Sequence, residues 1–329
     1  MERKSENVTP KLSIVVRAYN QAEEVIRALS SIVEQNVSCK VEIVIGVDYS
    51  IDNTLQAVKE FCKDLPSNFV ANVIAHPERV GGEMNFVTCM KACTGEYVAF
   101  CDGDDYYIDK DKSKKQIEIL DNNPNVCLVY GNYIIESPYV EGGQKKQWRT
   151  EPGSNPFTTM LNGNYLGTNI TMFRGELLQY VEWDVLLTNK WPQDDYFLWL
   201  EIAHRGDFYH MPDFLAVYTV TRHIDDNTIK ESCEYDVTTT QMKEYYIRKY
   251  PTCTDMTVDV VWNMHYKDQF RSAVLINDYL LAKDAVDHLL HLGKVDLYYR
   301  LLRVKIIWRM YMIYRKKKFG KRKALEGYF

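Results

Sequence analysis

Short apolar runs alternate with helical patterns over the first third of the chain. Four nearly continuous hydrophobic runs predict strands, at residues 12–16, 41–47, 69–74 and 97–101. Three segments between them have the apolar spacing of helices, at residues 21–34, 54–65 and 85–92. Strands joined by helices are expected to run parallel and to be buried on both faces. The pattern therefore predicts an α/β fold with a Rossmann-like, mostly parallel sheet flanked by helices.

The pattern changes after residue 105. Helices are predicted at 112–121 and 195–204, and further strands at 126–130, 168–173, 208–211 and 215–220. The polar stretch 137–156 contains Gly and Pro and predicts a long loop. From residue 233 onward the spacing is almost purely helical. We expect a main domain at residues 10–225 and a helical C-terminal extension with a basic tail at 226–329.

The charge is divided unevenly along the chain. The 329 residues carry a net charge of −5, but residues 291–329 hold twelve Lys and Arg against two acids, so this tail is +10 and the rest is −15. An acidic body argues against nucleic-acid binding, whereas a basic, aromatic tail suits an anionic membrane surface. The tail charges do not gather on one helical face, so packing against protein is the alternative to membrane contact.

The N-terminus and the cysteines predict a cytoplasmic protein. The first ten residues are polar, and no run reaches the roughly 18 apolar residues of a spanning helix, so we expect neither a secretion signal nor a membrane span. The eight cysteines form no CxxC pair and lie mostly in apolar segments. This usage is typical of a reducing compartment, with no structural zinc site. A peripheral position on the inner face of the cell membrane is compatible with it.

An acidic motif, Asp102-Gly103-Asp104-Asp105, directly follows the fourth predicted strand. Ligands of parallel sheets bind beyond the carboxyl ends of the strands. Carboxylates this dense repel one another unless a cation lies among them, and hard oxygen ligands suit Mg²⁺ or Mn²⁺ bridged to phosphates. The alternative is an acidic turn that leads into the next helix.

Two other strand ends carry candidate binding groups. Asp48, Ser50, Asp52 and Thr54 follow the second strand, where Asp52 or Asn53 would cap the next helix. Capping does not explain Asp48, whose carboxylate could accept hydrogen bonds from a base or a ribose. Tyr19 follows the first strand and could stack on a base or simply pack.

A third acidic pair, Asp194 and Asp195, begins the predicted helix at 195–204. Acids at a helix N-terminus are stabilised by the helix dipole, so capping is one interpretation. If the helix begins at the ligand crevice, one of the two carboxylates is a candidate general base.

In their order and spacing, these motifs resemble the inverting glycosyltransferases of family 2, which have the GT-A fold. The resemblance covers about residues 12–225 and is closest to the bacterial surface-polysaccharide branch. It rests on residues 14–20, 48–54, Gly82, Asn85, 94–97, 102–105, Asp195 and 198–200.

The resemblance implies a role for each matching residue. It places the nucleobase at Tyr19 and Asp48, the ribose and metal at Asp102 and Asp104, and the catalytic base at Asp195. The implied donor-binding set is Ala18, Tyr19, Asp48, Arg79, Asp102, Gly103 and Asp104, with Asp104 and Asp102 as metal ligands and Asp105 as a further candidate.

Two departures from the family pattern leave alternatives open. The acidic pair is Asp194-Asp195 where Glu-Asp is commoner, so either carboxylate could be the base. The usual Tyr-Arg-x-His after the last strand is replaced by a longer segment ending in His223, which could be a metal or phosphate ligand or a structural residue.

The function implied is transfer of a sugar from a nucleotide-diphosphate sugar, a UDP-sugar, to a hydroxyl of a saccharide or lipid-linked acceptor, with Mg²⁺ or Mn²⁺. Two alternatives remain from the residues alone. A nucleotidyltransferase acting on sugar phosphates would usually have a Gly-rich phosphate loop after the first strand, where this chain has Arg17-Ala18-Tyr19-Asn20. The other is a non-catalytic nucleotide-sugar binding protein.

Overall fold

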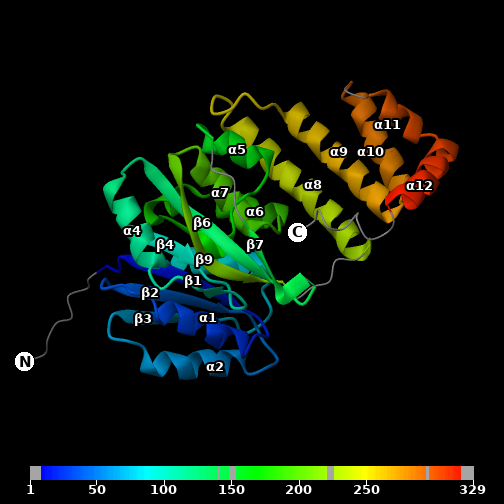
Figure 1. Ribbon diagram of the computed structural model, residues 1–329. Coiled ribbons are helices and arrows are strands. Elements are labelled where there is room, and N and C mark those ends of the chain that lie inside the picture. The colour runs from blue at the N-terminus through cyan, green and yellow to red at the C-terminus, as the bar shows by residue number, and fades with distance from the viewer. Residues whose placement is uncertain (1–8, 140, 148–152, 221–225, 294–295, 320–329) are drawn as a thin grey trace, which may run out of the picture. The chain divides into compact units, whose positions relative to one another are not determined.

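The computed structural model describes residues 9–139, 141–147, 153–220, 226–293 and 296–319. The chain divides into two compact units, Met1–Arg222 and His223–Phe329. The first unit contains the sheet, and the second is helical (Figure 1).

The first half of the sheet is parallel, as the alternation of strands and helices predicts. Its strands lie in the order β3-β2-β1-β4. They are β1 (Leu12–Ala18), β2 (Val41–Val47), β3 (Phe69–Ala75) and β4 (Tyr97–Phe100), and the helices between them are α1 (Glu24–Val33), α2 (Thr54–Phe61) and α3 (Gly82–Ala92). α1 buries Val25, Ala28, Leu29 and Ile32, the spacing of one helical face. Figure 1 shows α1 and α2 on the same side of these strands.

The second half makes the sheet mixed. β4 pairs antiparallel with β8 (Thr171–Arg174), β8 pairs antiparallel with β6 (Val126–Glu136), and β6 pairs parallel with β9 (Asp207–Thr219). β5 (Tyr106–Tyr107) pairs antiparallel with β9. The helices here are α4 (Lys112–Asn122), α5 (Pro156–Asn162), α6 (Trp183–Asn189) and α7 (Asp194–Ala203).

Two predicted features of this half are wrong. The stretch 137–156 is not only a loop, because β7 (Gln144–Gln147) pairs antiparallel with β6. β7 is polar and pairs at one edge only, so no hydrophobic pattern marks it. The two runs at 208–211 and 215–220 form the single strand β9, which continues through Pro212. The ladder with β6 is irregular around Asn132, whose Nδ2 donates to the Pro212 carbonyl at 2.8 Å.

An aromatic cluster joins α3 and α7 to the middle of the sheet. The Phe100 ring at the end of β4 lies 5.8 Å from Phe86 of α3 and 5.7 Å from Trp199 of α7, between ring centroids. Phe173 of β8 lies 5.9 Å from Trp199. All four rings are buried. This packing fixes α7, so the position of its acidic first turn is set by the core.

In its described residues, the second unit contains five helices with their own core. They are α8 (Asp226–Lys249), α9 (Val258–Ile276), α10 (Tyr279–His291), α11 (Leu297–Leu302) and α12 (Lys305–Phe319). Phe270, Val274, Val286, Leu302 and Trp308 are buried together. Among the described residues, no helix has both the length and the apolar character needed to span a bilayer.

Candidate functional site

A polar cleft of about 360 Å³ opens where β1, β2 and β4 end. The carboxyl ends of neighbouring parallel strands meet at one edge of the sheet, so side chains that follow these strands are brought together. The predicted site residues that line the cleft are Ala18, Tyr19, Asp48, Arg79, Asp102, Asp104 and Asp105. Arg17 and Tyr218 line it as well, although neither was predicted as a site residue.

The loops after β1 and β2 are held together by short polar side chains. Asn20 has a left-handed backbone, φ 52°, and its Oδ1 accepts from the Ile51 N–H at 2.9 Å. Asp52 accepts from the N–H of Thr54, the first residue of α2, at 3.0 Å and from the Ala22 N–H at 3.2 Å. Asn53 is the N-cap residue but makes no side-chain cap bond, so the bond to the first N–H of α2 comes from Asp52, one residue earlier.

Asp48 is buried and binds the loop that precedes α3. Its Oδ1 accepts from the Val80 N–H at 2.9 Å, and its Oδ2 accepts from the Gly81 N–H at 3.0 Å. That loop carries Arg79, whose guanidinium lies 4.5 Å from the centroid of the Tyr19 ring. Oδ1 also accepts from the Tyr49 N–H at 2.8 Å. Asp48 thus fixes one wall of the cleft, and its Oδ2 keeps a lone pair for a further donor.

Gly103 brings the acidic motif close to β1. Its N–H donates to the Arg17 carbonyl at 2.8 Å, and a Cβ at this position would lie 2.8 Å from the same oxygen. Any larger residue would push the motif away from the strand. Gly103 is not among the residues that line the cleft. Close packing against β1 therefore explains why this position holds a glycine.

Arg17 connects two of the predicted acidic groups. Its Nε and Nη2 donate to Asp102 at 2.7 and 2.9 Å, and its Nη1 donates to Asp194 at 2.8 Å. Paired guanidinium–carboxylate bonds of this kind fix orientation as well as charge. The guanidinium also lies 5.0 Å from the Phe86 ring centroid. The available signal in the sequence was a charged residue directly after the predicted strand at 12–16.

Asp105 is the buried one of the three carboxylates in the acidic motif. It accepts from the Thr219 N–H and from Asn169 Nδ2, both at 2.9 Å. Burial, together with Asp102 and Asp104, holds the pKa of Asp105 well above its usual range. Asp105 therefore joins the acidic motif to β9 and the segment before β8.

Asp104 is the carboxylate best suited to a cation. Within the described residues, no side chain pairs with it, and burial and the charge of Asp102 raise its pKa. Four aspartates and two arginines line the cleft, so a diphosphate would enter a negatively charged space. A divalent cation on Asp104 would relieve the repulsion between Asp104 and Asp102 and the repulsion between the cleft and the diphosphate. Mg²⁺ is commonly held by one or two carboxylates plus substrate phosphates.

The protein supplies few metal ligands of its own. No group of three or more His, Cys, Asp or Glu in the described part of the chain is arranged to hold a metal ion. Asp102, the second predicted ligand, already accepts two bonds from Arg17. The chemistry of Asp104 fits a cation completed by phosphate and water. The predicted candidate His223 lies outside the described residues.

Asp194 and Asp195 begin α7 but have different partners. Asp194 is buried against Arg17, and burial, which outweighs that pairing, raises its pKa to about 7. Asp195 Oδ1 accepts from the Tyr196 N–H at 2.7 Å, and its Oδ2 lies 3.4 Å from Asn164 Nδ2. Burial raises the pKa of Asp195 also. Asp195 Oδ2 is thus the more available acceptor of the pair.

These features define an α/β protein with an acidic cleft at the carboxyl ends of its parallel strands, and comparison with known proteins places the chain in a family. The chain belongs to glycosyl transferase family 2, whose family model matches residues 13–180. An uncharacterized protein of Mycobacterium tuberculosis is 29% identical over 217 residues, which cover 64% of this chain and 59% of that protein. An uncharacterized glycosyltransferase of Haemophilus influenzae is 24% identical over 310 residues, 88% of this chain and 92% of that protein.

An Escherichia coli relative carries a specific name. The UDP-Glc:alpha-D-GlcNAc-diphosphoundecaprenol beta-1,3-glucosyltransferase WfgD is 28% identical over 192 residues, 58% of this chain and 69% of that enzyme.

Solved structures confirm the predicted GT-A fold. S. aureus TarS residues 1–349 align with a TM-score of 0.51 at 17% identity, covering 91% of each chain. The Pyrobaculum calidifontis mannosyltransferase PcManGT, solved with GDP-Man and Mn²⁺, aligns with a TM-score of 0.54 at 16% identity, over 97% of this chain and 86% of that one.

Proposed function

We propose that this protein is an inverting glycosyltransferase that moves a sugar from a UDP-sugar to a hydroxyl of a saccharide or lipid-linked acceptor in surface-polysaccharide synthesis. The observation that carries the proposal is Arg17, which binds both Asp102 of the acidic motif and Asp194 at the start of α7. One hydrogen-bonded unit therefore links the proposed donor site to the helix with the proposed base. The name of WfgD and the structures of TarS with UDP and UDP-GlcNAc support the choice of donor.

The donor would be held along the ends of three strands. Tyr19 and Arg79 offer a stacked aromatic and cationic surface for the base, and Asp48 offers a carboxylate for a base N–H. Asp102, which Arg17 orients, would accept a hydrogen bond from a ribose hydroxyl. Asp104 would hold a divalent cation, with Asp102 next to it. That cation would offset charge on the departing diphosphate, an effect worth several kcal/mol.

Asp195 is the proposed general base. The acceptor oxygen attacks the anomeric carbon as the bond to the diphosphate breaks, and the hydroxyl proton moves to Asp195 Oδ2. The nucleoside diphosphate leaves from the opposite face, so the anomeric configuration is inverted. A raised pKa brings this carboxylate closer to the acidity that favours proton transfer near neutral pH. Asp194 is the proposed positioning residue, because it is already bound to Arg17.

A donor screen tests the proposal directly. The protein is incubated with a panel of labelled nucleotide sugars and Mn²⁺, and the products are separated. Slow release of UDP with free sugar, increased by an acceptor extract, is the expected result. Release of pyrophosphate would indicate nucleotidyl transfer, and binding without any turnover would indicate a nucleotide-sugar binding protein. Either result would overturn the proposed reaction.

A cytoplasmic site at the inner face of the cell membrane belongs to the same proposal. The acceptor named for WfgD carries a diphosphoundecaprenol lipid, which a membrane would hold. The basic C-terminal tail would bring the cleft to such an acceptor through a peripheral contact.

A further inference from the structure

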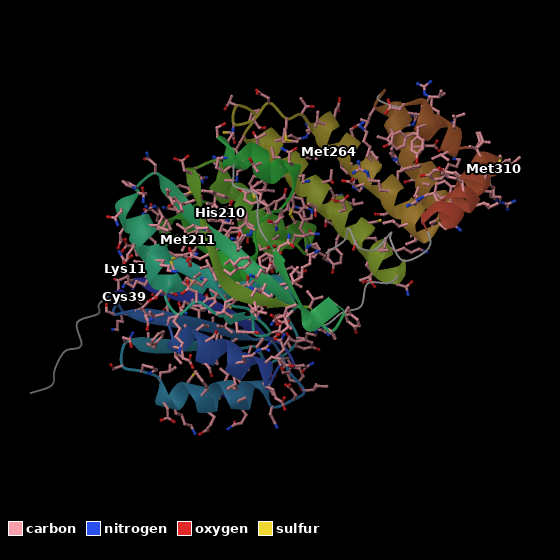
Figure 2. The ribbon with its side chains drawn as sticks, viewed as in Figure 1. Lys11, Cys39, His210, Met211, Met264 and Met310 are labelled. Carbon is pink, nitrogen blue, oxygen red and sulfur yellow. The ribbon has the colours of Figure 1, made fainter. Side chains whose placement is uncertain are left out.

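α12 has two apolar faces. Its inner face packs Trp308, with Ile307, Tyr311 and Met312, against the core of α9 and α10. On the other side, Ile306, Met310 and Ile313 are 70%, 66% and 59% exposed. Spaced four and three residues apart, they form one stripe of the helix. Figure 2 shows Met310 at the outer edge of the helical unit.

The segment before α12 also exposes apolar side chains. Leu297 and Leu301, four residues apart on α11, and Val304 between the helices are all exposed. Six exposed aliphatic side chains within seventeen residues are not the scattered single residues that an ordinary protein surface carries. The stripe could not be predicted from the sequence, because apolar residues lie on both faces of α12 and the helix is not clearly amphipathic.

The charge around the stripe favours an anionic surface. Arg300, Lys305 and Arg309 are exposed in the same two helices, and the sequence has no acidic residue from Leu297 to Leu325. A second copy of the chain docked through the same face would bring these cations against one another. An anionic bilayer instead accepts apolar side chains and basic groups together.

We infer that the stripe of Ile306, Met310 and Ile313, extended by Leu297, Leu301 and Val304, inserts into the headgroup layer of an anionic bilayer. The flanking Arg and Lys side chains bind the lipid phosphates while their apolar stems lie along the stripe. The inference deepens the membrane contact of the proposed function and rests on that part of it alone.

Vesicle binding tests the inference with the full chain. The variant Ile306→Ser, Met310→Ser, Ile313→Ser is compared with wild type by sedimentation with phosphatidylcholine vesicles that contain one quarter phosphatidylglycerol. We expect at least a tenfold fall in the partition coefficient. Leu280→Ser is the matched control, because Leu280 is 74% exposed on α10, and it should bind as wild type does. Pure phosphatidylcholine vesicles should bind wild type at least tenfold more weakly.

Three results would overturn the inference. The first is vesicle binding by the triple variant that equals that of wild type. The second is an equal loss of vesicle binding in the Leu280→Ser control. The third is a dimer of the wild-type protein in sedimentation equilibrium that the triple substitution converts to monomer while vesicle binding stays unchanged. Thermal unfolding followed by circular dichroism checks that the variants fold. Hydrolysis of the UDP-sugar by the triple variant should equal that of wild type. If no nucleotide sugar is turned over at all, the proposed reaction fails while the vesicle result still decides this inference.

Discussion

The Nη1 nitrogen of Arg17 lies 2.8 Å from Oδ2 of Asp194, a residue 177 positions further along the chain. The same guanidinium binds Asp102 through its other two nitrogens. One cation at the end of β1 therefore compensates two carboxylates, one in the loop after β4 and one at the start of α7. Since these carboxylates are largely withdrawn from water, removal of Arg17 would leave both without a compensating charge.

Arg17→Met should destabilise the protein by about 3 kcal/mol, because it leaves two largely buried carboxylates without their partner. The loss should be greater at pH 8 than at pH 5, since protonation of Asp194 removes one of the two uncompensated charges. Urea unfolding at the two pH values measures this. Arg17→Lys keeps the charge but not the paired geometry, so it should retain more stability than Arg17→Met. Equal stability of wild type and Arg17→Met would contradict the role.

The stability of the protein should fall as the pH rises from about 4 to 7. Burial raises the pKa of Asp194 to about 7 in the folded state, above the ordinary value of 3.8, so the folded protein binds the additional proton. The contribution is complete below pH 4 and is lost as the pH passes 7, with an upper limit of about 4 kcal/mol. Asp194→Asn should flatten the curve over this range. An unchanged slope in that variant would assign the titration to another group.

Asp104→Asn should weaken UDP binding at least tenfold in the presence of Mn²⁺ and should not weaken it without metal. The reason is that Asp104 offers the cation a carboxylate that no side chain of the described residues binds, whereas without the cation this carboxylate repels the diphosphate. Isothermal titration calorimetry with and without Mn²⁺ gives both affinities. Asp64→Asn, an exposed charge change outside the cleft, is the matched control. Equal loss with and without metal would remove the cation role from Asp104.

Asp195→Asn should lower kcat by about 10² to 10⁴ and change the Kd for UDP by no more than a few-fold, because a general base acts in the transition state. Rates of transfer and calorimetric affinities test the two halves of this prediction. The wild-type rate should rise with pH through the pKa of the base, which burial holds above the ordinary value for aspartate. If Asp194→Asn instead causes the larger loss of kcat and abolishes the acidic limb, Asp194 is the base.

Local periodicity was sufficient for the parallel half of the sheet and for the location of the cleft. Apolar runs predicted β2 at residues 41–47 with its observed ends, and helical spacing predicted α2 from Thr54. Because ligands bind beyond the ends of such strands, Asp48, Asp102 and Asp104 could be proposed from their positions alone. Their catalytic and binding roles remain predictions.

Tertiary packing decided the features that depend on contacts between residues far apart in the chain. β7 exists because β6 offers it an edge, and the exposed stripe of α12 exists because Trp308 occupies the other side of the helix. Asp194 and Asp195 are indistinguishable in sequence, yet Arg17 binds only Asp194. A residue's neighbours along the chain set its propensity and periodicity, but the pairing and burial of a charge depend on groups that only the folded chain brings together.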